Sequence, residues 1–157
     1  MSIKNIKPNR GQFSQGYYTP INESKYVGPK PIVYRSSWER KMCMYCDEKS
    51  EILKWSSEPI KIKYLSPIDN KVHYYYPDFY MRVKQQDGSE IEYIVEVKPS
   101  KQLKKPKEPK RKTKKAVANY KYAAKEYLKN RAKVAAAKEY AIEKGMKFII
   151  LTEKTLK

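Results

Sequence analysis

The chain has 157 residues, of which 40% are hydrophobic, and a formal net charge of +18. This length predicts one domain large enough to bury a core. No apolar run approaches the roughly 18 residues of a membrane span, and the N-terminal sequence lacks the apolar segment of a secretory signal. Two cysteines, Cys43 and Cys46, do not make a disulfide framework, so we expect a reducing intracellular setting.

The excess of 35 Lys and Arg over 17 Asp and Glu indicates a polyanionic partner, of which nucleic acid is the commonest. A basic but inert surface is the alternative. The 15 tyrosines argue against a disordered polycation. An anionic membrane surface is less favoured, because no basic amphipathic helix carries a large apolar face.

Residues 1–30 mix prolines and glycines with polar residues, which predicts an extended arm in front of a domain spanning 31–157. Tyrosines in the arm could anchor it on the domain or on a partner; these are Tyr17, Tyr18 and Tyr26. A helix is then expected from Ser36 to about Leu53. Ser36 and Glu39 have capping-box spacing, with the glutamate reaching back to the N-cap amide. A carboxylate in this first turn could instead point at a metal held by a neighbouring sheet.

Three strands are expected next, as a meander over 59–65, 72–83 and 90–98. Asp87-Gly88 predicts the hairpin turn between the second and third strands. Residues 101–115 then hold nine basic residues and one glutamate. We interpret this segment as a mobile basic linker that also contacts phosphates, through Lys101, Lys104, Lys105, Lys107, Lys110, Arg111, Lys112, Lys114 and Lys115.

The last part of the chain predicts a long Ala-rich helix from about Lys114 to Lys144, with Gly145 beyond its C-terminus and a short buried strand over 148–151. An approximate apolar stripe is expected along this helix, formed by Val117, Tyr120, Ala124, Tyr127, Leu128, Val134, Ala135 and Ile142. A helix that leads into an apolar strand after a meander predicts a mixed sheet with helices packed against it.

Charged residues stand in two of the predicted strands, Asp78 in the second and Glu96-Val97-Lys98 at the end of the third. Charged groups are costly to bury unless they are paired or hold a cation. Two carboxylates and a lysine that converge there could bind Mg²⁺ and activate water against a phosphodiester. Glu96 and Lys98 lie on the same face of the strand because one residue separates them. The alternatives are a turn residue at Asp78 and an exposed Glu96–Lys98 ion pair.

Pro77-Asp78, Glu96-x-Lys98 and Glu39 in the first helix resemble the PD-(D/E)XK nuclease superfamily. Residues 34–39, 76–79 and 94–98 look like TnsA-type endonucleases, and the whole chain looks most like the head completion nucleases of large contractile-tailed phages. This resemblance implies an α/β fold with a restriction-endonuclease-like core, a mixed β-sheet flanked by helices in the order α-β-β-β-α-β.

The same resemblance implies a role for each matching residue. Asp78, Glu96 and the carbonyl of Val97 would bind Mg²⁺, or Mn²⁺, and Glu39 would complete the acidic cluster directly or through water. Lys98 would orient or deprotonate the attacking water and offset charge on the phosphate.

The function implied is metal-dependent endonuclease cleavage of DNA that processes packaged ends during head completion, before tail attachment. The partners would be DNA and phage head or portal proteins. The protein would be located in the virion and in the host cytoplasm. The alternative is a non-catalytic structural protein of the phage head that binds DNA, because fold does not settle catalysis.

Two further motifs have simpler interpretations. Cys43 and Cys46 have zinc-ligand spacing, but no second cysteine pair follows and His73 is the only histidine, so buried packing is favoured. His73 is interpreted as a strand residue rather than a general base.

Overall fold

The computed structural model describes residues 15–155. Its centre is a four-stranded mixed sheet in the order β3-β6-β7-β8, with β3, β6 and β7 antiparallel and β8 parallel to β7. The strands are β3 (Ile52–Ser57), β6 (Phe79–Lys84), β7 (Glu90–Val97) and β8 (Lys147–Leu151). The predicted mixed sheet is therefore confirmed.

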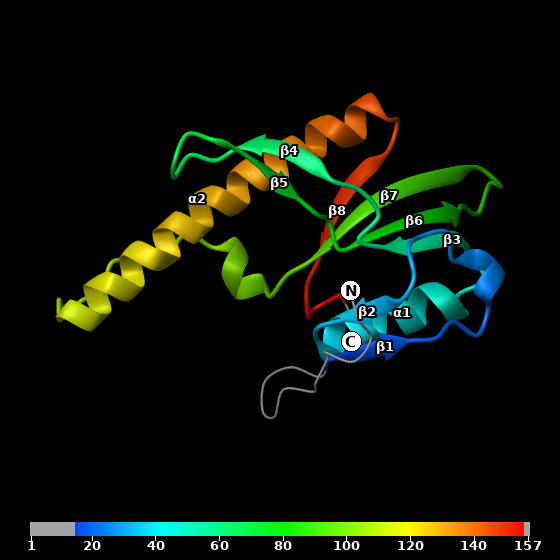
Figure 1. The fold of residues 1–157 in the computed structure, drawn as a ribbon, viewed down its shortest axis with the longest axis horizontal. Helices are drawn as coiled ribbons and strands as arrows, with labels where there is room; N and C mark the ends of the chain where they lie inside the picture. The colour runs from blue at the N-terminus through cyan, green and yellow to red at the C-terminus, as the bar shows by residue number, and fades with distance from the viewer. Residues whose placement is uncertain (1–14, 156–157) are drawn as a thin grey trace.

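Opposite faces of this sheet are covered by different elements (Figure 1). One face packs against helix α1 (Ser37–Glu48), through the α1 residues Met42, Cys43 and Cys46. The other face is covered by helix α2 (Lys114–Glu143) and by a separate hairpin of strands β4 (Ile62–Leu65) and β5 (Val72–Tyr75). Alternating residues of β7 accordingly face α1 or α2.

The expected meander is wrong in its first member. Within residues 15–155, β4 pairs only with β5, and the strand beside β6 is β3, whose first two residues were predicted as the end of the first helix. Helix α1 ends at Glu48, and Lys49 is already extended. Ile52 is buried in β3 instead of continuing a helical face, and it packs in the core cluster with Trp55.

The expected strand over 72–83 is interrupted between Tyr75 and Phe79. Pro77 lies at this break, and its side chain is fully buried. Proline has no backbone N–H to give to a sheet, so it ends the pairing of β5 with β4 before β6 begins. The result is a chain that leaves the hairpin on α2 and enters the central sheet within a few residues.

The N-terminal segment packs on the domain from residue 15 onward; residues 1–14 of the predicted arm lie outside the described residues. Strand β1 (Gly16–Tyr18) pairs with β2 (Ile32–Tyr34), and a 3-10 turn, η2 (Glu23–Lys25), lies between them. The rings of Tyr18 and Tyr26 lie 6.0 and 4.8 Å from Trp55. The segment is therefore anchored on the domain itself.

Asp47, buried near the end of α1, fixes the position of this segment. Its carboxylate accepts hydrogen bonds from the hydroxyl of Tyr18 at 2.6 Å and from the backbone N–H groups of Ile21 and Asn22 at 2.7 and 2.9 Å. A buried carboxylate needs such donors because it has lost its water.

The second half of the chain follows the predicted order of elements, although the last strand is half-buried and not buried as expected. The hairpin turn carries Gly88 at φ 88°, and Gly145 follows α2 at φ 69°, both in the left-handed region. The predicted stripe on α2 is partly wrong: Ile142 and Leu128 are exposed, and the buried positions are Ala137 and Ala141. Small residues are buried because the sheet and the hairpin approach the helix closely. No helix within residues 15–155 has both the length and the apolar composition needed to span a bilayer.

Candidate active site

Asp78, just before the start of β6, meets Glu96, near the C-terminal end of β7. Phe79 pairs with Val95 in antiparallel register, so the residues next to them, Asp78 and Glu96, come opposite each other. The backbone N–H of Val97 donates to Asp78 Oδ2 at 2.8 Å. Two carboxylates that are distant in the sequence are thus brought together by one strand pairing.

Glu96 is buried and both of its carboxylate oxygens have partners. Oε1 lies 3.4 Å from Lys98 Nζ, and Oε2 accepts a hydrogen bond from the hydroxyl of Tyr75. The Glu96–Lys98 pair is therefore on one face, as the spacing predicted, but it is not the exposed surface ion pair of the alternative interpretation. A pair in this setting is held by its surroundings as well as by its mutual attraction.

Burial raises the pKa of Asp78 above its usual range, and the charges of Glu96 and Glu39 raise it further. The N–H of Val97 and the charge of Lys98 act in the opposite direction. Two adjacent carboxylates at a buried position fit a site for a divalent cation, which would compensate their charge. The described residues contain no group of three His, Cys, Asp or Glu side chains placed to hold a metal ion.

Glu39 lies in the first turn of α1, at the edge of this acidic pair. Its backbone N–H donates to Ser36 Oγ at 3.1 Å, which confirms Ser36 as the N-cap. Its carboxylate accepts from the backbone N–H of Arg35, one residue before the predicted N-cap amide. Burial raises the pKa of Glu39, with smaller contributions from Glu58 and Glu96 in the same direction. Glu39 therefore interacts with Glu96 through its charge, while its carboxylate is hydrogen-bonded to the backbone in front of α1.

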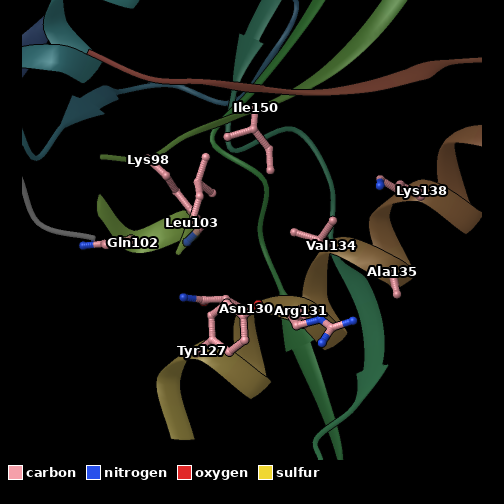
Figure 2. Close-up of a pocket in the computed structure, with 10 residues that line it drawn as sticks. All are labelled: Lys98, Gln102, Leu103, Tyr127, Asn130, Arg131, Val134, Ala135, Lys138 and Ile150. Atoms are coloured by element: carbon pink, nitrogen blue, oxygen red, sulfur yellow. The ribbon is translucent and has the colours of Figure 1, made fainter. Parts of the chain in front are cut away.

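The nine basic side chains between Lys101 and Lys115 are all exposed. The segment begins with the 3-10 turn η3 (Ser100–Leu103) and ends at Thr113, the N-cap of α2. A pocket of about 340 Å³ opens between this segment and α2, next to Lys98 (Figure 2). Lys98, Arg131 and Lys138 contribute its basic lining.

Sequence reasoning missed four residues around the site; these are Tyr75, Arg131, Lys133 and Lys138. Tyr75 alone had a local signal, since it precedes Pro77-Asp78 in the same segment. The three basic residues belong to a helix with many similar lysines, and only the tertiary fold selects them.

The two cysteines and the histidine have structural environments. Cys43 and Cys46 are fully buried in the core cluster, and burial raises the pKa of both thiols. His73 lies on β5 and contacts Asp69 at 2.7 Å on the exposed side of the hairpin. The packing interpretation of the cysteines agrees with this placement.

Residues 49–153 match the family described as TnsA-like endonuclease N terminal. Because this match covers more than half of the chain, the chain belongs to this family. Asp78, Glu96 and Lys98 lie inside the matched range and Glu39 lies outside it. The chain is also 36% identical over 143 residues to the head completion nuclease of Enterobacteria phage T4, which covers 90% of this chain and 93% of that protein. These similarities confirm the predicted restriction-endonuclease-like fold and a nuclease of phage head completion.

Proposed function

We propose that this endonuclease hydrolyses DNA phosphodiesters with a divalent metal ion, Mg²⁺ or alternatively Mn²⁺, held by Asp78 and Glu96. The observation that supports this site is the meeting of the two carboxylates at the start of β6 and the end of β7, where burial and mutual repulsion raise the pKa of Asp78. The carbonyl of Val97 would supply a third oxygen, and Glu39 would complete the cluster through water, because no third carboxylate of the described residues is placed to hold the ion directly. Hard oxygen donors are the ligands that Mg²⁺ prefers.

Lys98 is assigned the positioning of the attacking water and of the scissile phosphate. Its ammonium group lies 3.4 Å from Glu96 Oε1, so a small side-chain movement brings it to a phosphate bound beside the carboxylates. Asp78 and Glu96 would hold a divalent ion whose chemistry is to polarise a phosphate and lower the pKa of a bound water. Lys98 then offsets the negative charge that develops on the phosphate oxygens.

DNA is held mainly through its phosphates in this proposal. The nine basic residues of 101–115 are exposed, and four of them line a pocket of about 680 Å³ between the segment and α2; the four are Lys101, Lys104, Lys105 and Lys107. The smaller pocket is lined by Lys98, whose ammonium group lies 3.4 Å from Glu96 Oε1. Phosphate contacts position DNA without reading sequence, so sequence preference is weak.

The biological setting follows from the similarity to the T4 head completion nuclease. We place the reaction at the ends of packaged DNA, which the enzyme processes before tail attachment. The protein partners are head or portal proteins, and the enzyme acts in the host cytoplasm and remains with the virion.

The test is cleavage of linear and branched duplex DNA with Mg²⁺, Mn²⁺ or EDTA by the parent chain and by Asp78→Ala and Glu96→Ala. Cleavage should need metal and fall by on the order of 100-fold or more in both variants, while DNA binding is kept. Glu92→Ala is the matched control, since it removes a carboxylate from the same face of β7. Metal-dependent cleavage that survives in Glu96→Ala would place the site elsewhere, and an inert parent that still binds DNA would favour a binding protein without catalysis.

A further inference from the structure

Tyr75 is the last residue of β5, and its hydroxyl reaches from the hairpin into the active site. The side chain is 6% exposed, and its hydroxyl donates to Glu96 Oε2. Within residues 15–155, no other protein group donates to this oxygen. Glu96 itself is buried, so the hydroxyl takes the place of a water molecule on one side of the carboxylate.

The ring of Tyr75 is held in place by the packing of the hairpin on α2. Tyr75 pairs with Ile62 across the hairpin and belongs, with Ala137, to a buried cluster that is separate from the main core. The ammonium group of Lys133, from α2, lies 5.7 Å from the centre of the Tyr75 ring. Three elements therefore fix the hydroxyl: β4, β5 and α2.

The two contacts of Glu96 differ in character. Lys98 Nζ is 3.4 Å from Oε1, which is longer than an ordinary hydrogen bond, whereas Tyr75 bonds directly to Oε2. Tyr75 is also the more rigid partner, because an aromatic side chain on a packed strand has less freedom than a lysine stem. The orientation of Glu96 thus depends on Tyr75 more than on Lys98, and Lys98 stays available to the substrate.

We propose that Tyr75 is a positioning residue that holds the Glu96 carboxylate in the orientation required for a divalent cation between Asp78 and Glu96. The inference rests on the metal site proposed above. Carboxylate ligands are held by outer hydrogen bonds, and removal of such a partner typically weakens metal binding by about 10- to 100-fold. In this assignment the β4–β5 hairpin is part of the active site, although it is not part of the central sheet.

Tyr75→Phe tests this assignment, because it keeps the ring and removes the hydroxyl. Mn²⁺ affinity is measured by titration calorimetry on the DNA-free protein, beside Glu96→Ala and the matched control Tyr64→Phe. Tyr64 lies in the same cluster, is 7% exposed and has Lys133 Nζ 5.9 Å from its ring. We expect Mn²⁺ affinity to fall by about 10- to 100-fold in Tyr75→Phe, to stay at the parent value in Tyr64→Phe and to be lost in Glu96→Ala.

The metal dependence of cleavage gives a second measurement. The Mn²⁺ concentration for half-maximal cleavage should rise in Tyr75→Phe by the same factor as the dissociation constant, and saturating Mn²⁺ should restore the parent rate. Near-UV circular dichroism and thermal unfolding show that each variant keeps its tertiary packing.

The outcomes separate this inference from the proposal on which it rests. Parent Mn²⁺ affinity in Tyr75→Phe, together with loss in Glu96→Ala, refutes the role of Tyr75 and leaves the metal site intact. An equal loss in Tyr64→Phe also refutes it, because packing of the cluster would then be responsible. Parent affinity in Glu96→Ala refutes the metal site itself.

Discussion

Replacement of Asp78 by asparagine should remove the proposed metal site and stabilise the metal-free protein at the same time. Burial, followed by the charge of Glu96, raises the pKa of Asp78 from 3.8 to about 8. The folded protein therefore binds this proton more tightly than the unfolded chain does. The contribution of Asp78 to stability is then greatest at low pH and is lost as the pH rises from about 4 to about 8.

The size of the effect follows from linkage. One proton held only by the folded state lowers the free energy of unfolding by at most about 1.4 kcal/mol per pH unit. Between pH 5.5 and 7.5 this amounts to about 2–3 kcal/mol, which Asp78→Asn should recover because an amide does not ionise. For a domain of this length the gain corresponds to a rise in Tm of roughly 4–12 °C.

The assay is urea unfolding of parent and variant from pH 5 to pH 8.5, with and without Mg²⁺. The parent curve should fall toward neutral pH relative to that of Asp78→Asn, and Mg²⁺ should stabilise only the parent, since ligand that binds the folded state adds stability. Asp87→Asn, in the exposed hairpin turn, is the control and should change stability by no more than about 0.5 kcal/mol. Parallel curves for parent and Asp78→Asn, or equal stabilisation of both by Mg²⁺, would refute the reasoning.

Three other outcomes are expected. Asp47→Ala should lower the free energy of unfolding by about 3 kcal/mol, measured by urea unfolding at pH 7. The reason is that one tyrosine hydroxyl and two backbone N–H groups lose a charged acceptor. An unchanged free energy of unfolding would show that Asp47 does not anchor the N-terminal segment. Replacing three lysines within 101–115 by glutamine should reduce the slope of log affinity for DNA against log salt by about 0.9 for each phosphate that no longer pairs with a lysine, and an unchanged slope would exclude these lysines from the interface. EDTA should leave the Tm of the protein in metal-free buffer unchanged, since Cys43 and Cys46 pack in the core, whereas loss of a structural zinc would lower it.

The parts of the site that the sequence predicts are those that depend on strand alternation. Glu96 and Lys98 lie on one face because side chains alternate along β7, and this holds whatever the neighbours of the strand are. The break at Pro77 was not predicted, because the pattern over 72–83 indicated one continuous strand, although a proline cannot donate to a sheet. The limits of α2 and the Asp-Gly hairpin follow from residues that start or end local structure.

The pairing of strands depends on contacts between distant segments, and here the sequence misled. The segment over 59–65 alternates apolar and basic residues as a sheet strand does, yet its apolar side packs on α2. Ile52 and Leu53 were expected to end the first helix, yet they begin β3, in which Trp55 packs against the tyrosines of the N-terminal segment. The order α-β-β-β-α-β still describes the core, because β3 occupies the place that the prediction gave to 59–65.

The interruption at Pro77 also explains why one short segment serves the site twice. Tyr75 ends the hairpin that packs on α2, and Asp78 precedes the strand that enters the central sheet. Because the chain changes sheets between them, Tyr75 approaches Glu96 from the hairpin, while Asp78 contacts the backbone of Val97 from just before the start of β6. An uninterrupted strand would alternate its side chains across a single sheet, and Tyr75 would follow the pleat of β6 instead of the packing on α2. The break therefore lets two groups of the site come from the same short stretch of chain. One is Asp78, a candidate metal ligand, and the other is the hydroxyl of Tyr75, which bonds to the second candidate ligand, Glu96.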